Sequence, residues 1–462
     1  MERVDVAIVG GGPAGAAAAH AAADENAEAV VLEKGVPRAD RDVLGPDSTD
    51  AAGILDYWVD VMGVHPDEFP DDVICQELDR AEFVGPTEDC TLTSTGIDSS
   101  YDHFGYTFQR ARFDDWLRER AEAAGASYRV GVRVRDVESD LATTGDEPCH
   151  RVVVADGEDI GADAVVLADG PQRTVTNQVL DDYLPEDTPA SERLAAPKAN
   201  HIAYQEYRRV PDAVFEELKT AITFWWGHMP GHTAYPWVFP NDDGVCRIGL
   251  TMPIGLDIDA VEDRDAYPLL EPDDETIPNG ATYIRRLLEL EWGDAYDIET
   301  DFPIVEDRGK RDGTETYSIS STQPIESPAD AGIAVVGGAM GTTSAFHEGG
   351  DHVAVRTGAI AGELAATGEL AAYNDRWRSA IGDELLRNVT FAELCRDYAP
   401  DDWDRTFKSV RGMLTAEGVN LFEMNTLRSG LSGAKILYQY KKQKRRLRKQ
   451  GYTQLTESDY VY

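Results

Sequence analysis

The chain has 462 residues, which is enough for a large buried core divided into two or three lobes. It carries 85 Asp and Glu residues against 43 Lys and Arg, for a formal net charge of −42. Disorder is excluded because 42% of the residues are hydrophobic. The acidic surface excludes nucleic acid as a partner and is typical of adaptation to a salt-rich cytoplasm, where screening relieves self-repulsion.

The cysteines and the apolar segments set the cellular context. Five scattered cysteines, none in C-x-x-C spacing, predict neither a disulfide framework nor a metal site. The first strand begins at residue 3, so no signal peptide precedes it, and no apolar run approaches the length of a membrane span. We therefore expect a reducing, cytoplasmic location.

The first motif is a glycine-rich turn after an apolar strand. Residues 4–9 read V-D-V-A-I-V, which predicts a buried parallel strand, and Gly10, Gly12 and Gly15 follow in the spacing G-x-G-x-x-G. Gly10 and Gly12 allow a tight turn and close approach to a pyrophosphate, whereas Gly15 lets the next helix, 14–23, pack on the strand.

The helix and the second strand complete this motif. The helix begins at Ala14 and directs its N-terminal amides toward phosphates. The second strand, 29–32, ends at Glu33 and Lys34, and the Glu33 carboxylate can accept hydrogen bonds from ribose hydroxyls. Strand, turn, helix, strand and acid in this order predict an adenine dinucleotide site, the alternative being a merely structural turn.

The remaining elements follow from apolar spacing and turn residues. The stretch 163–168 is another buried strand and ends on Asp169 and Gly170, and the run 332–336 leads to a second glycine turn. Between them, 188–301 has more aromatic residues and proline-bounded strands. We expect a loop at 35–50, a helix at 51–62, antiparallel strands within 73–108, a helix from 108 to 125, strands at 130–137 and 151–154, a helix at 351–366 and mostly helices after 371.

These elements predict an α/β fold. A Rossmann-like dinucleotide-binding domain carries an inserted antiparallel-sheet substrate domain and a helical C-terminal region. The expected divisions are 1–187 for the dinucleotide-binding domain, with a strand excursion at about 73–108, 188–301 for the substrate lobe, 302–370 for the return and 371–462 for the helical region with a basic tail.

Three separated motifs carry a family resemblance. The glycine motif, the L-A-D-G turn at 167–170 and the G-G-A-M-G…H-E-G-G segment at 337–350 occur in the order found in aromatic hydroxylases, flavin halogenases and geranylgeranyl reductases. The resemblance covers about residues 1–370 and implies FAD as the cofactor. It places the late glycine turn beside the flavin ribitol, and the helix that follows stabilises the reduced flavin through its dipole. The implied cofactor residues in these two later motifs are Asp169, Gly170, Gly338, Gly349 and Gly350.

A fourth motif narrows the family. The segment Tyr235-Pro-Trp-Val-Phe-Pro, followed by Gly249, resembles the Y-x-W-x-F-P…G-x-G signature of the geranylgeranyl reductase family, although Thr251 replaces the second glycine. The resemblance implies an apolar cavity for a long isoprenoid tail. The alternative is a strand whose aromatic side chains only fill the core. The implied lining residues are Tyr235, Trp237, Phe239 and Pro240.

Further matches and departures bear on the same resemblance. The segment from Arg110 resembles the family's R-x-x-F-D-x-x-L, which implies that Arg110 contacts the cofactor, against the alternative of a solvated arginine. Gly338 stands where the family usually has an aspartate that contacts the ribitol. The stretch 43–49 lacks the family's substrate-facing cysteine. The resemblance and the charge together indicate a halophilic archaeon.

Reduction of an isolated alkene requires a hydride from reduced flavin and a proton on the other carbon. His347 and Tyr235 are the candidate catalytic residues for the proton, and each could instead be a hydrogen-bonded core residue. We expect a reductase of geranylgeranyl chains, such as those of archaeal membrane lipids. The alternatives are a flavin monooxygenase or halogenase of a small aromatic compound and a flavin-fold protein without turnover. The electron donor stays open.

The C-terminus reverses the charge of the chain. Residues 441–450 carry seven cations in ten positions and follow an apolar and aromatic stretch, 436–440. A basic helix of this kind can lie on an anionic membrane surface, which would suit a lipid substrate. The alternative is that the cations pair with the protein's own acidic face.

Overall fold

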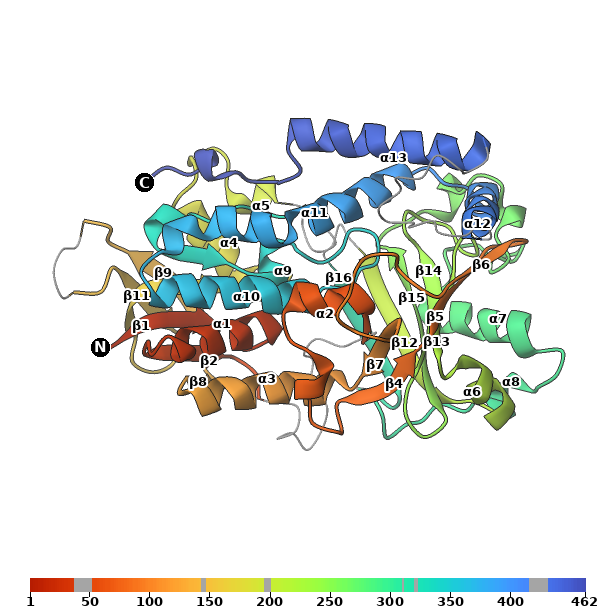
Figure 1. The fold of residues 1–462 in the computed structure, drawn as a ribbon, viewed down its shortest axis with the longest axis horizontal. Coiled ribbons are helices and arrows are strands. Elements are labelled where there is room, and N and C mark those ends of the chain that lie inside the picture. The colour runs from red at the N-terminus through yellow and green to blue at the C-terminus, as the bar shows by residue number, and fades with distance from the viewer. Residues whose placement is uncertain (37–51, 143–146, 195–200, 310, 320–322, 415–430) are drawn as a thin grey trace.

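A computed structural model describes residues 1–36, 52–142, 147–194, 201–309, 311–319, 323–414 and 431–462. Figure 1 shows two sheets side by side, with a layer of helices on the first sheet and with the C-terminal helices lying across the top of the molecule. Within the described ranges, no helix is both long and apolar enough to cross a membrane. The stretch 43–49, where the family's cysteine is missing, lies outside these ranges.

The first sheet is the dinucleotide-binding sheet. Its strands are β1 (Glu2–Val9), β2 (Ala29–Glu33), β8 (Ser127–Val130), β9 (Val134–Ser139), β10 (His150–Val154), β11 (Ile160–Leu167) and β17 (Ile333–Val335), in the order β8-β2-β1-β11-β10-β9 with β17 also paired to β11. The pairs among β8, β2, β1, β11 and β17 are parallel. The carboxyl ends of these strands share one edge, which is where ligands bind in such sheets.

Two of the helices that cover this sheet lie unusually close to each other. α1 (Pro13–Asp24) lies beside α10 (Asp351–Ala366), as Figure 1 shows. A Cβ atom at Gly358 would lie 2.0 Å from the carbonyl oxygen of Ala14, and one at Gly362 would lie 2.1 Å from that of Ala18. The alanine and glycine content of both helices therefore reflects backbone-to-backbone packing.

The second sheet combines three stretches of chain. Its order is β16-β12-β15-β14-β13-β5-β6, and all neighbours are antiparallel except β13 and β5. β16 lies beyond residue 301, where the sequence placed the end of the substrate lobe. The strands are β5 (Arg80–Val84), β6 (Asp89–Leu92), β12 (His201–Arg209), β13 (Ala221–Trp225), β14 (Tyr235–Pro240), β15 (Val245–Pro253) and β16 (Thr314–Ile319).

Each face of the second sheet has its own core. One face packs against α6 (Asp212–Leu218) and α7 (Gly280–Trp292). The other face carries Tyr235, Trp237 and Phe239 and packs against side chains of the N-terminal segment and of α12 (Pro400–Leu414). Because β14 is buried on both faces, all six of its residues are buried.

The expected helix at 51–62 is wrong in its first half. Gly53–Leu55 form β3, which pairs with β7 (Gly105–Phe108), and β7 also pairs with β4 (Ile74–Leu78). Only α2 (Asp56–Met62) is helical within the predicted range that the structure describes. Pairing with β7 and the close contact of Gly53 with the Phe239 ring override the helical spacing of the apolar residues.

The expected strand at 130–137 is two strands. β8 and β9 lie at opposite edges of the first sheet, and the chain turns between them at Gly131, whose φ is +73°. The helix from 108 to 125 is confirmed as α3 (Arg110–Ala124), and the helix at 351–366 is confirmed as α10. Short helices α4 (Thr174–Asp181), α5 (Ala190–Arg193), α8 (Ile298–Asp301) and α9 (Gly337–Met340) complete the central part of the chain.

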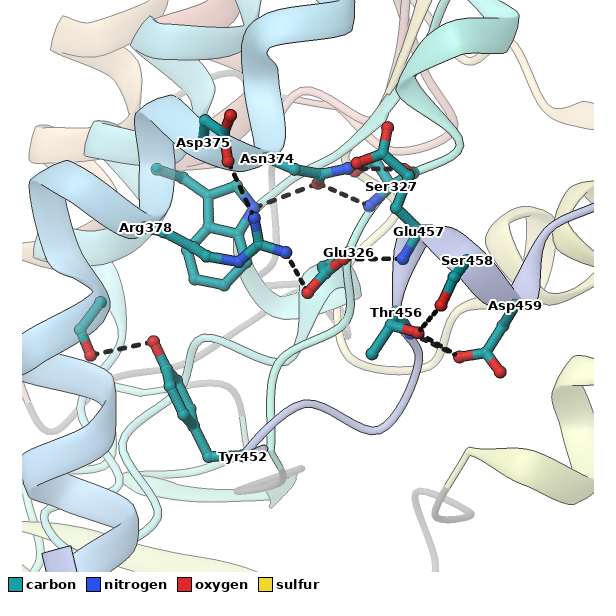
Figure 2. A network of polar contacts seen from close by, with 12 residues as sticks. Glu326, Ser327, Asn374, Asp375, Arg378, Tyr452, Thr456, Glu457, Ser458 and Asp459 are labelled. Atoms are coloured by element: carbon teal, nitrogen blue, oxygen red, sulfur yellow. Dashed lines mark hydrogen bonds and ion pairs between the residues drawn. The ribbon is translucent and has the colours of Figure 1, made fainter. Parts of the chain in front are cut away.

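The C-terminal region is helical, as expected, and its last residues return to the first lobe. After α11 (Tyr373–Leu394) and α12, α13 (Leu431–Gln450) packs along α11. The tail 452–462 then docks beside Glu326, as Figure 2 shows. The Tyr460 hydroxyl donates to the Glu326 carbonyl oxygen at 2.6 Å, the Glu457 amide donates to the Glu326 carboxylate at 2.7 Å, and Leu455 is fully buried.

The acidic surface leads to a first prediction. Raising potassium chloride from 0.01 M to 1 M shortens the screening length from about 30 Å to about 3 Å. Because a net charge of −42 repels itself, the melting temperature should rise over this range. Calorimetry at several salt concentrations measures this, with potassium glutamate as a control for anion effects. An unchanged melting temperature would contradict the halophilic interpretation.

Candidate functional site

The three motif glycines have different surroundings. Gly10 has a φ of +101°, and a Cβ there would lie 2.4 Å from the Ala168 carbonyl oxygen. A Cβ at Gly15 would lie 1.9 Å from the Gly10 carbonyl oxygen, whereas one at Gly12 would meet no atom within 4 Å. Packing therefore requires glycine at positions 10 and 15, and Gly12 faces open space at the start of α1.

This open space suits a pyrophosphate. Gly12 is the N-cap residue of α1, and no side chain caps the helix, so the first amides of α1 remain available to an anion. At the end of β2, the Glu33 carboxylate accepts hydrogen bonds from the amides of Gly11 and Gly35, both at 2.6 Å. Each oxygen has a second lone pair for a ribose hydroxyl. Lys34 is exposed.

The Asp169 side chain contacts the start of α4. Its carboxylate accepts hydrogen bonds from the amides of Val175 and Thr176, at 2.7 and 3.1 Å, and from the Thr176 hydroxyl at 2.5 Å. The side chain thus holds the first turn of α4. The neighbouring Gly170 has a φ of +78° and open space at its Cβ position, so this turn can still approach a cofactor through its backbone.

The late glycine turn lies against the turn after β11. A Cβ at Gly338 would lie 3.0 Å from Cδ of Pro171, so a side chain in that direction would press on the Pro171 ring. The Arg173 Nε donates a hydrogen bond to the Ala339 carbonyl oxygen at 2.7 Å and so stabilises the late glycine turn. Burial lowers the pKa of Arg173 to about 10.

Arg110 is buried, which excludes the alternative of a solvated arginine. Its Nε lies 2.7 Å from Asp114, and its Nη1 lies 3.1 Å from Asp351, the first residue of α10. Arg110 thus joins the starts of α3 and α10. The N-cap residue Gly350 has no capping side chain, and the Trp58 ring would lie 3.3 Å from a Cβ at Gly349.

The two candidate proton donors lie together, but neither is well suited to the task. Burial, with a smaller contribution from Arg387, lowers the pKa of His347 to about 3, so its ring is neutral at physiological pH. The Tyr235 hydroxyl donates to the His347 carbonyl oxygen at 2.9 Å. Burial, followed by the charge of Glu348, raises the pKa of Tyr235 well above its ordinary value. Tyr235 therefore joins β14 to the loop before α10.

The aromatic side chains of β14 form a wall between the two lobes. Trp226 stacks on Tyr235 at a centroid distance of 4.2 Å and on Phe346 at 5.1 Å. Trp237 lies over Gly249, where a Cβ would approach its ring to 2.7 Å. The Pro240 carbonyl oxygen accepts a hydrogen bond from the Thr107 hydroxyl at 2.7 Å, which fixes the end of the strand.

Sequence reasoning missed a polar cluster behind this wall. Glu348, His201 and Thr251 meet beside Tyr235, although they lie on three separate segments of the chain. The H-E-G-G segment was read for its histidine and its glycines only. The sequence signal that could have identified Glu348 is an acidic residue directly before two glycines at the start of a helix. The burial of the Glu348 side chain, however, depends on the pairing of distant strands.

Known proteins with similar sequences and folds agree with this geometry. Residues 7–172 match a family model described as FAD-NAD(P)-binding. Digeranylgeranylglycerophospholipid reductase of Methanosphaerula palustris is 25% identical over 93% of this chain and 98% of its own, and a second such reductase, from Methanopyrus kandleri, is 27% identical over 82% and 83%. A geranylgeranyl bacteriochlorophyll reductase-like protein of Thermoplasma acidophilum has the same fold, with a TM-score of 0.66, 20% identity and 97% and 99% coverage.

The open glycine turn, the acid at the end of β2 and the uncapped start of α10 fit FAD. Together with the family model, they define an FAD-dependent oxidoreductase whose dinucleotide-binding domain carries an inserted antiparallel sheet. Within this class, the chain is similar to digeranylgeranylglycerophospholipid reductases over nearly the whole of both chains.

Proposed function

We propose that this protein reduces carbon–carbon double bonds in the geranylgeranyl chains of a glycerophospholipid. The observation that carries this proposal is the match over 82% to 93% of this chain to relatives named digeranylgeranylglycerophospholipid reductase. Bound FAD, once reduced, supplies the hydride for this chemistry. The proposed cofactor contacts are the backbone at Gly10, Gly12, Ala14 and Gly15, the Glu33 carboxylate, and the glycines 170, 338, 349 and 350.

The chain's own residues would position the alkene and exclude water. Tyr235, Trp237 and Phe239 alternate along β14, so their rings share the face that is directed at the first lobe. An apolar aromatic face of this kind suits an isoprenoid tail. The uncapped N-terminus of α10 would stabilise negative charge on the reduced cofactor.

The direct test is a mass measurement. The protein is purified in molar potassium chloride, and its visible spectrum is recorded for bound flavin. Digeranylgeranylglyceryl phosphate in detergent micelles is then supplied with dithionite as the reductant. We expect the lipid mass to increase by two hydrogens for each reduced double bond, and no increase without dithionite. An unchanged lipid mass with fully reduced flavin would contradict the proposal.

A prediction for the aromatic wall follows from its burial. Trp237 is 3% exposed, so a charged residue there would unfold the sheet and would not report on substrate binding. Trp237→Phe keeps an aromatic ring and should retain flavin, while turnover of the lipid falls about tenfold through lost contact area. The matched control is Trp292→Phe in α7, which packs against the opposite face of the sheet, and it should leave turnover unchanged. Equal turnover in both variants would indicate that Trp237 only fills the core.

A second candidate function is halogenation or hydroxylation of a small aromatic compound. The myxobacterial chondrochloren halogenase has the same fold over 96% of this chain, with a TM-score of 0.57 and 16% identity. Incubation of the reduced protein with oxygen, bromide and a phenol would produce a brominated or hydroxylated product under this alternative. We expect none.

The basic helix α13 supports a peripheral membrane contact. Tyr440 and Leu447 are buried on one face, against α11, and Arg448 pairs with Asp383 at 2.9 Å. The opposite face is exposed and lines a shallow depression. We call this face the cationic face, and it consists of Lys442, Arg445, Arg446 and Lys449.

Deletion of 441–462 would not test this contact, because it removes Leu447, Leu455 and Tyr460 from the core. Replacing all four residues of the cationic face by Gln should weaken binding to vesicles containing phosphatidylglycerol by about 4 kcal/mol at moderate salt, at roughly 1 kcal/mol per cation. Cosedimentation measures the binding. The control is Arg448→Gln, whose side chain faces Asp383. If the control lost as much binding as the fourfold variant, the cationic face would not be the contact.

A further inference from the structure

Glu348 is a buried acid whose oxygens lack hydrogen bonds. Its side chain is 3% exposed, and in the described part of the chain neither carboxyl oxygen has a partner at hydrogen-bond geometry. His201 Nδ1 lies 3.4 Å from Oε1. Burial raises the pKa of Glu348, and His201, Thr251 and Thr233 oppose this only in part. Because an ionised carboxylate is disfavoured in such surroundings, burial favours the protonated form of this acid.

Glu348 lies on the loop that joins the aromatic wall to the start of α10, because the Tyr235 hydroxyl donates to the carbonyl oxygen of the preceding residue, His347. It belongs to the loop 344–349, which is closed by hydrogen bonds from the Ser344 amide to the Gly349 carbonyl oxygen at 2.9 Å and from the Glu348 amide to the Ser344 carbonyl oxygen at 3.0 Å. The next residue, Gly350, caps α10, whose N-terminus faces the cofactor in the proposed function.

The second sheet supplies the other side of this position. Tyr235, Thr251 and Ala203 lie directly opposite one another on β14, β15 and β12, so their side chains share one face. His201, two residues before Ala203, lies on the same face. The titratable groups that face Glu348 are thus His201 and Tyr235, and the Tyr235 proton is already donated to the His347 carbonyl oxygen.

The backbone at Glu348 is also unusual. Its φ of +58° lies in the left-handed region, which glycine adopts freely and a glutamate rarely does. Thr233, beside His201, has a φ of +50° and a buried hydroxyl. A glycine at 348 would be easier to accommodate, so the glutamate is held there at a conformational cost. Such strain is concentrated at functional sites.

We propose that Glu348 is the general acid of alkene reduction, an inference that rests on the proposed function. As one alkene carbon accepts the hydride from reduced FAD, the other carbon takes the proton of the Glu348 carboxyl. The carboxyl O–H bond, the bond that holds the hydride on the reduced cofactor and the carbon–carbon π bond would break, two C–H bonds would form, and the cofactor would be oxidised by two electrons. Glu348 is left as a carboxylate, which His201 stabilises until a proton from solvent restores the acid, and an external reductant restores the flavin.

His201 is a positioning residue in this scheme. Its Nε2 lies 2.7 Å from the His232 carbonyl oxygen, which can only accept, so Nε2 carries a proton. In the neutral ring, Nδ1 is therefore the acceptor for the Glu348 proton, and in the protonated ring Nδ1 donates to the carboxylate. The ring can stabilise both states of the acid without moving.

The first test needs no turnover. Infrared difference spectra of wild type minus Glu348→Gln at pH 7, recorded without substrate, should contain the C=O stretch of a protonated carboxyl. The band should persist in Glu326→Gln, a control that removes a different buried carboxyl, the one that pairs with Arg378 near the tail. If the protein has no such band at pH 7, Glu348 is ionised, and the inference is overturned.

The second test compares stability with activity. Glu348→Gly should raise or maintain the melting temperature, because glycine relieves the left-handed backbone, and should keep its flavin, whereas lipid reduction should fall at least 100-fold. Added formate should restore part of the rate by entering the space of the lost carboxyl. Glu326→Gln should do the opposite, with a lower melting temperature and unchanged turnover. Full activity of Glu348→Gly without formate overturns the inference.

The third test concerns His201 and separates the inference from the proposed function. In His201→Gln, kcat should fall with KM unchanged, and the solvent deuterium isotope effect on turnover should increase because reprotonation becomes slow. An unchanged isotope effect would overturn the positioning role. If the wild-type protein reduces no isoprenoid lipid, the proposed function fails, whereas wild-type turnover that is matched by the Glu348 variants overturns only the role of Glu348.

Discussion

Gly12→Val should abolish FAD binding and leave the fold intact. The Cβ position of Gly12 has no protein atom within 4 Å and its φ of −71° is accessible to any residue, so we expect the protein to accommodate a valine. The side chain instead occupies the space through which the pyrophosphate would approach the first amides of α1. We expect FAD affinity to fall at least 100-fold, or by about 2.8 kcal/mol, with an unchanged melting temperature of the flavin-free protein.

Flavin content after purification and titration of the flavin-free protein with FAD measure this effect. Gly412→Val, on an exposed part of α12 where the Cβ position is also open, is the matched control and should keep its flavin. Gly15→Ala should behave differently, because its methyl group would lie 1.9 Å from the Gly10 carbonyl oxygen and so disturb the fold. Full flavin content in Gly12→Val would show that the cofactor binds elsewhere.

Gly358→Ala should cause a large loss of stability from a single methyl group. The new Cβ would lie 2.0 Å from the Ala14 carbonyl oxygen, and α1 could make room only by moving away from α10. The expected loss is about 3 kcal/mol in the free energy of unfolding, at the upper end for overpacked cores. Since α1 begins at the glycine turn, flavin affinity should fall as well.

The control for this prediction is a second Gly→Ala substitution that we expect to change the stability in the opposite direction. Alanine is the better helix former, so Gly412→Ala on the exposed part of α12 should stabilise the protein by up to about 1 kcal/mol. The two substitutions are chemically identical and differ only in what the methyl group meets. Denaturant unfolding in molar salt gives both values. A stabilising Gly358→Ala would show that α1 and α10 are not in backbone contact.

Local sequence was sufficient for the glycine motif and for the long helices. The spacing of Gly10, Gly12 and Gly15 between two apolar runs predicts a strand, a turn and a helix, because each step depends on residues close in the chain. The same holds for α3 and α10, whose boundaries follow from apolar spacing and flanking glycines. The extreme charge and the Y-P-W-V-F-P segment likewise required no structure to be recognised.

Tertiary structure decided the contacts between segments that are far apart in the sequence. Gly53–Leu55 became a strand because β7 pairs with it, and residues 130–137 divided between two edges of one sheet. Asp169 caps α4, and Arg110 pairs with Asp351, contacts that depend on how α4 and α10 dock. No local pattern encodes such contacts.

The polar cluster around Glu348 shows the same division most clearly. Its members come from β12, β15 and the loop before α10, and they meet only because strand register sets Thr251 opposite Tyr235 and places His201 on the same face. By itself, the sequence determined the cofactor class and the presence of a glutamate before two glycines. Only tertiary packing removed water from that glutamate, and this loss of water raises the pKa of its carboxyl group.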